Sequence, residues 1–154
     1  MISISNRQRA HKIDLRLLEK IAAATLAQLN ITRAELGIVL VGAKEMASLN
    51  EKFLQHEGPT DVITFDYSDK VAPPGAARTA PRAVPVIIRG EIFVCIAEAE
   101  RQAIVFGTDW FSELVRYIVH GILHLSGHDD LEPLARKRMK REENRLLRKL
   151  VEMQ

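Results

Sequence analysis

The sequence predicts an α/β (α+β) fold that forms one domain over residues 1–154. Segments rich in β-branched and aliphatic residues alternate with segments whose apolar residues recur every three or four positions, as strands and helices alternate in such folds. Of the 154 residues, 47% are hydrophobic and 27% are charged, so one domain can bury a sizeable core. No apolar run approaches the roughly 20 residues that cross a bilayer, so we expect no membrane-spanning segment.

The N-terminus and the cysteine content predict a cytoplasmic protein. Residues 1–6 show no basic segment followed by a long apolar one, so we expect no secretory signal. Cys95 is the only cysteine, which excludes an intrachain disulfide, and its apolar neighbours predict that the thiol is buried.

The first third of the chain predicts the order strand, helix, strand, helix. Residues 1–5 alternate apolar and polar side chains, which is typical of a strand. Residues 11–30 carry apolar side chains at helical spacing, and Asn30 is expected to end that helix. A continuous aliphatic run over 36–41 predicts a strand buried on both faces. Residues 43–54 then predict a helix. Its inward-facing side chains would be Met46, Leu49 and Phe53.

The middle of the chain predicts two strands separated by a loop. Residues 62–67 have the composition of a strand. Residues 68–85 are rich in proline and alanine, so we expect a surface loop rather than a regular element. Residues 86–96 predict a strand or a hairpin, in which Gly90 marks a bulge or a close approach.

The last third of the chain predicts three helices. Residues 97–106 form the first, which Gly107 closes. Thr108 or Asp109 caps the second. Its apolar residues recur at steps of three and four: Trp110, Phe111, Leu114, Ile118, Ile122 and Leu125. The third covers residues 131–151 with a partial apolar stripe, formed by Leu131, Ala135, Met139, Leu146 and Leu150.

Two histidines on the second of these helices predict a metal site. His120 and His124 are four residues apart, so both imidazoles project from the same side of the helix. Gly127 can reverse the chain at the helix exit and bring back a third ligand, either Asp130 or His128. Three protein ligands leave a fourth position for water, which is the catalytic form of a zinc site. We therefore expect one zinc ion per chain.

The spacing is similar to the extended zinc-protease pattern, with one decisive difference. Such proteases carry a glutamate directly after the first histidine as their general base. Here that position is Gly121. A peptidase would need a carboxylate from elsewhere, such as Glu91 or Glu113.

The charge of the chain is unevenly distributed. Residues 133–150 contain eight basic residues and two glutamates, a net charge of +6, while the rest of the chain carries −4. A basic helix on a mildly acidic protein can hold phosphates. The alternative is an ordinary solvated helix face.

Three blocks of sequence resemble the YbeY family, bacterial metal-dependent endoribonucleases of ribosomal RNA maturation. The first is HGILHLSGHDD at residues 120–130. The second consists of LNEKF at 49–53 followed by PTDVITF at 59–65, and the third is GEIFVC at 90–95. The blocks follow the family order and cover residues 49–130.

The resemblance implies a zincin-like fold with a single mixed sheet of four to five strands packed with helices. It also implies a single-strand-specific, zinc-dependent endoribonuclease that matures the 3′ end of small-subunit ribosomal RNA and acts in ribosome quality control. The expected partners are therefore single-stranded RNA, ribosomal RNA or the small ribosomal subunit. The matching blocks make Asn50, Thr60 and Asp61 candidate substrate contacts.

Two positions depart from the family pattern. The third metal ligand is usually histidine, and register places Asp130 there. His128 stands where a tyrosine is common, as a rival ligand, a donor to a ligand or a proton carrier, because an imidazole exchanges protons near neutral pH.

The second departure is Leu54, which occupies the place of a family arginine thought to serve RNA cleavage. Arg78, Arg82 or Arg116 would then have to meet the phosphate. The non-enzymatic alternative is a ribosome assembly factor in which the metal holds the fold.

Overall fold

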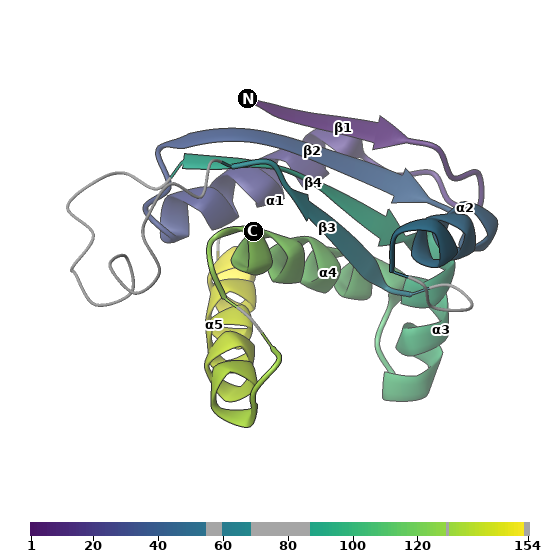
Figure 1. Cartoon of the computed structure of the whole chain (residues 1–154). Helices are drawn as coiled ribbons and strands as arrows, with labels where there is room; N and C mark the ends of the chain where they lie inside the picture. Colours follow the sequence, from purple (N-terminus) through teal and green to yellow (C-terminus); the bar gives the residue numbers. More distant parts are fainter. Residues whose placement is uncertain (55–59, 69–86, 129, 153–154) are drawn as a thin grey trace.

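The computed structural model describes residues 1–54, 60–68, 87–128 and 130–152, and shows a mixed sheet with helices packed against it (Figure 1). In the described residues the sheet has four strands in the order β1-β2-β4-β3. Strands β1, β2 and β4 are parallel, and β3 is antiparallel to β4. Their bounds are Ile2–Asn6 (β1), Arg33–Val41 (β2), Val62–Asp66 (β3) and Ile87–Cys95 (β4). The predicted α/β (α+β) class and the mixed sheet are confirmed.

Five α-helices accompany the sheet in the described residues. Figure 1 shows α4 running beneath the sheet, with α3 and α5 extending away from the sheet on either side of α4. The bounds are Leu15–Gln28 (α1), Ala43–Leu49 (α2), Ile96–Phe106 (α3), Trp110–Leu125 (α4) and Pro133–Glu152 (α5). Within the described residues, no helix is long and apolar enough to cross a membrane.

The two faces of the sheet bury different side chains because successive residues of a strand point to opposite sides. On β2, Leu36, Ile38 and Leu40 belong to the larger core, which also includes buried residues of α1, α4 and α5. Val39 and Val41 point the other way and join Met46 of α2 in a smaller core. The prediction that this strand is buried on both faces is thus confirmed. Cys95 is also buried, as predicted.

Helix α4 lies unusually close to the central strand β4. A Cβ atom placed on Gly90 would lie 2.6 Å from the carbonyl oxygen of Phe65 and 2.8 Å from Cδ2 of Leu125. On the helix side, a Cβ on Gly121 would lie 2.7 Å from Cγ2 of Ile92. Two glycines therefore permit this contact, and the predicted close approach at Gly90 is confirmed within a single strand rather than a hairpin.

The N-terminal helix prediction is wrong at its start. Helix α1 begins at Leu15 rather than at residue 11, because the Asp14 carboxylate accepts hydrogen bonds from the Arg16 and Leu17 amides and caps the helix there. Asn30 has a positive φ of 57°, so it does stop the helix as predicted.

The prediction of one helix over residues 43–54 is also wrong. Helix α2 ends at Leu49, and a π-helical turn covers Asn50–Leu54. Met46 is buried as predicted, but Phe53 is 51% exposed because the wider turn rotates it away from the core.

The start of the last helix requires a similar correction. Helix α5 begins at Pro133, a residue favoured in the first helical turn. Leu131 therefore precedes the helix and is 84% exposed instead of joining the buried stripe. The predicted loop over 68–85 lies, apart from Ser68, outside the described residues.

Candidate metal centre

Helix α4 fixes the positions of both histidines. Its first turn is capped by Asp109 rather than Thr108, since an Asp109 oxygen accepts the Ser112 amide at 2.8 Å. Its apolar stripe packs beneath the sheet, with Leu114, Ile118 and Ile122 fully buried. The same helix carries His120 and His124, whose side chains are 26% and 24% exposed. The helix thus offers both imidazoles to solvent from a rigid base.

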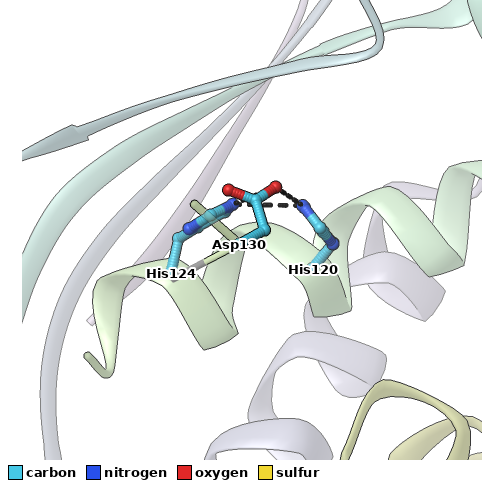
Figure 2. Close-up of side chains that lie close together, drawn as sticks. All are labelled: His120, His124 and Asp130. Carbon is cyan, nitrogen blue, oxygen red and sulfur yellow. Dashed lines mark hydrogen bonds and ion pairs between the residues drawn. The ribbon is translucent and has the colours of Figure 1, made fainter. Parts of the chain in front are cut away.

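The three predicted metal ligands converge (Figure 2). The Nε2 atoms of His120 and His124 are 3.1 Å apart. Asp130 Oδ2 lies 4.0 Å from the former and 3.8 Å from the latter. Gly127, with φ of 111°, makes the chain reversal that returns Asp130 to the helix. One donor atom from each residue lies within 4.8 Å of the others, a group that could hold a metal ion.

The hydrogen-bond partners of the two Nδ1 atoms determine where the imidazole protons lie, and they leave the two Nε2 atoms without protons. His124 Nδ1 lies 3.2 Å from the carbonyl oxygen of His128, which only accepts, so this nitrogen carries the hydrogen. His120 Nδ1 lies 2.9 Å from a carboxylate oxygen of Glu143. In the neutral imidazoles both Nε2 lone pairs therefore point into the space that Asp130 Oδ2 also faces. Three acceptor atoms that face one another in this way are a suitable cradle for a cation.

Glu143 of α5 supports this arrangement from a buried position. Its other carboxylate oxygen accepts a hydrogen bond from Arg116 Nη1 at 2.7 Å. Burial alone raises the pKa of Glu143, but the hydrogen bonds from His120 and Arg116 outweigh it and bring the pKa below its ordinary value. Burial likewise lowers the pKa of His120, yet the hydrogen bond with Glu143 and nearby carboxylates raise it above its usual range. The carboxylate therefore stays ionised beside the histidine.

A hollow of about 280 Å³ opens beside His120, between α3, α4 and α5. We call it the metal-site hollow. Asp61, Arg116, Arg136 and Lys140 contribute charged groups to its lining. Tyr117 also lines it, and its buried hydroxyl has no hydrogen-bond partner among the described residues. The hollow can accommodate a polar group of a ligand next to the metal donors.

The remaining predicted site residues are distributed differently. Asp61 lines the metal-site hollow. The Thr60 hydroxyl donates a hydrogen bond to the Asp61 carboxylate at 3.4 Å. Asn50 is buried at the end of α2 and does not line the hollow. The His128 side chain does not join the three donors; its charge helps to lower the pKa of Glu142 on α5, after the larger effect of the Arg145 hydrogen bond. Arg78 and Arg82 lie outside the described residues.

The carboxylates of the peptidase alternative are placed unequally. Glu91 accepts a hydrogen bond from the Tyr67 hydroxyl at 2.7 Å and does not line the metal-site hollow. Glu113 does line it, but it is buried and accepts a hydrogen bond from Thr108 at 2.9 Å. A Cβ on Gly121 would lie 2.7 Å from Ile92, so a glutamate at this position would require Ile92 to shift.

Sequence reasoning missed Glu143. It was counted only as one of two glutamates among the charges of a basic helix. Yet it lies four residues after Met139 and three before Leu146, in the buried stripe of α5. An acid inside an apolar stripe is the signal that identifies it, because a buried charge requires a partner.

The fold and the three donors define an α/β protein with a candidate metal centre carried on one helix. A family model described as endoribonuclease YbeY matches residues 3–151. The chain therefore belongs to the endoribonuclease YbeY family.

Individual relatives agree over most of their length. Endoribonuclease YbeY of Elusimicrobium minutum is 34% identical, over 83% of this chain and 82% of the relative. The same-named protein of Salinispora tropica is 32% identical, over 95% of this chain and 93% of the relative. Among solved structures, the solution structure of a Thermotoga maritima protein is similar with a TM-score of 0.62 and 26% identity, covering 97% of this chain and 89% of that one.

Proposed function

We propose that this chain is a zinc-dependent endoribonuclease that forms one domain and cuts single-stranded RNA. Its proposed role is maturation of the 3′ end of small-subunit ribosomal RNA and ribosome quality control, in the cytoplasm and on the small ribosomal subunit. The observation that carries the proposal is the convergence of three acceptor atoms, from His120, His124 and Asp130, in a member of this family. The relatives' name, endoribonuclease, supports RNA as the substrate.

The donor set supports zinc as the metal. Imidazole nitrogen and carboxylate oxygen are both zinc ligands, and a tetrahedral zinc with bonds of about 2.0–2.2 Å separates its donors by roughly 3.3–3.6 Å. The three separations here, 3.1, 3.8 and 4.0 Å, bracket that range. When bound, the metal would supply a Lewis acid that polarises a phosphodiester and lowers the pKa of water.

The surrounding side chains have separate proposed tasks. Glu143 orients His120 and keeps its Nδ1 protonated, as carboxylates do for metal-binding histidines. Arg116 holds Glu143 with one nitrogen and, at the wall of the hollow, has further donors for a phosphate in place of the arginine missing at Leu54. His128 is proposed as a proton carrier, although it would need to turn from the Glu142 side.

Four further groups are proposed to contact the substrate or to shape its site. Asp61 and Tyr117 both line the hollow. The Tyr117 hydroxyl has no hydrogen-bond partner among the described residues. Thr60 supports Asp61, and Asn50 is proposed to shape the adjoining turn. Arg78 and Arg82 stay predictions from the sequence.

The test measures metal content and RNA cleavage on the same protein samples. Zinc bound to full-length protein, purified without chelators, is quantified by mass spectrometry, and single-stranded ribosomal RNA is then added. We expect about one zinc and cleavage in the wild type, and loss of both in His120→Ala. Asp130→Ala should lose zinc as well, whereas His128→Ala should keep it and lose rate only.

The matched control is His11→Ala, which removes a histidine that is stacked on Trp110 and paired with Glu100. It should retain zinc and activity. Zinc without cleavage in the wild type would favour the assembly-factor alternative, and Leu54→Arg would then be the next variant. A wild type without any metal contradicts the proposal.

A further inference from the structure

We propose that a second hollow, on the α5 side of Arg116, binds the backbone of the RNA strand as it leaves the metal centre. This proposal rests on the proposed function. The hollow has a volume of about 690 Å³ and lies where α4 meets the C-terminal half of α5. We call it the arginine groove. Its lining consists of Arg116, Arg141, Asn144, Leu147, Arg148 and Val151.

The charge of the arginine groove differs from that of the metal-site hollow. Of the six described residues that line it, three are arginines and none is acidic. The metal-site hollow contains carboxylates from Asp61, Glu113, Asp130 and Glu143 beside its basic groups. A polyanion that enters the metal-site hollow therefore meets, in the neighbouring groove, positive charge that no described acidic lining residue opposes.

Two of the groove arginines have their guanidinium groups available. Among the described residues, neither Arg141 nor Arg148 forms an ion pair or a side-chain hydrogen bond. Two neighbouring arginines are occupied: Arg145 pairs with Glu142, and Arg116 bonds to Glu143 and Asn144. Arg141 and Arg148 are seven residues apart, so they lie on one face of α5 about 10 Å from each other.

The two hollows are continuous through one residue. Arg116 lines both of them, and it stands one helical turn before His120. A strand held at the metal centre can therefore cross Arg116 and continue along Arg141 and Arg148 without leaving the surface. Leu147 and Val151 add an apolar floor that suits sugar edges rather than base-specific contacts. This continuity favours the RNA itself over an acidic protein as the occupant.

The chemistry predicts binding to phosphates without reading of sequence. Arginine offers a planar fork of donors that matches a phosphate group. Each phosphate contact on a single strand contributes about 0.7 to the slope of log affinity against log salt concentration. Arg141→Gln and Arg148→Gln should therefore each lower that slope by about 0.7, and should weaken RNA binding several-fold at low salt.

The experiment compares these variants with Arg138→Gln. Arg138 is an exposed arginine on the same helix that does not line the groove. Binding of a labelled single-stranded RNA is measured by fluorescence anisotropy at several salt concentrations, with each variant in the non-cutting His120→Ala background. The KM for cleavage is measured in the native background, where Arg141→Gln and Arg148→Gln should raise it and Arg138→Gln should not.

Three results would overturn the inference. If Arg141→Gln and Arg138→Gln behave alike while the wild type binds and cuts RNA, only the groove is excluded. If the wild type binds polyglutamate, and Arg141→Gln abolishes this binding but leaves RNA binding unaffected, the groove serves an acidic protein instead. If the wild type neither binds nor cuts RNA, the proposed function fails together with the groove.

Discussion

His120 Nδ1 and Glu143 Oε2 lie 2.9 Å apart, so a predicted metal ligand on α4 is tied to a buried carboxylate on α5. The contact joins residues 23 positions apart in the chain. It fixes which nitrogen carries the proton and leaves Nε2 free for a cation. The last helix is thus part of the site and not only a cover for the core.

Removal of the Glu143 charge should weaken metal binding. Carboxylates that orient metal-binding histidines typically raise the affinity about 10–100-fold. We expect Glu143→Gln to raise the zinc dissociation constant by at least the lower figure, as measured by competition with a chromogenic chelator. Glu142→Gln is the control, because this neighbour pairs with Arg145 instead. Equal zinc affinities for the two variants would contradict the positioning role.

A side chain at position 121 should destabilise the fold. An alanine Cβ there would lie 2.7–3.1 Å from three atoms of the fully buried Ile92. Overpacking of this kind costs about 1–3 kcal/mol, partly offset by the better helix propensity of alanine, about 1 kcal/mol. Urea unfolding should therefore show a net loss for Gly121→Ala and a much larger one for Gly121→Glu.

The cause of that loss can be checked with a second substitution. Ile92→Ala removes the atoms that Gly121→Ala would meet, so the double variant should lose less stability than the sum of the two single variants. If the losses of stability are additive, the contact between α4 and β4 is not the cause of the destabilisation by Gly121→Ala.

The cap of α4 should make stability depend on pH. Hydrogen bonds from the Ser112 amide and hydroxyl hold the pKa of Asp109 below its ordinary value. A carboxylate with a depressed pKa in the folded state stabilises the protein above its unfolded pKa of about 3.9, and this contribution is lost as the pH falls through the folded value.

The measurement compares Asp109→Ala with the wild type. Loss of an N-cap costs about 1 kcal/mol, so the free energies of unfolding should differ by that amount at pH 7, and the difference should shrink below pH 4 as Asp109 loses its charge. Asp109→Asn keeps an acceptor oxygen and should retain most of the cap at both pH values. A difference between Asp109→Ala and the wild type that does not change with pH would show that the carboxylate charge has no part in it.

The sequence was sufficient to predict that His120, His124 and Asp130 converge, because their geometry is local. A helical period places His120 beside His124, and a glycine in a left-handed conformation returns Asp130. The strand order was not predictable, since the pairing of β2 with β4 joins segments separated by some fifty residues. The exposure of Phe53 was predicted wrongly because no sequence pattern around it indicates a π-helical turn. Glu143 was missed because its role depends on α5 packing against α4.

The site residues also occupy a short span of the chain. The α4 cap, the three donors and the supporting carboxylate all lie between Asp109 and Glu143. The parallel sheet, in contrast, needs pairings between distant segments, which form slowly because long loops must close first. We therefore expect α4 and α5 to assemble early during folding, so that the chain can capture its metal before the sheet is complete.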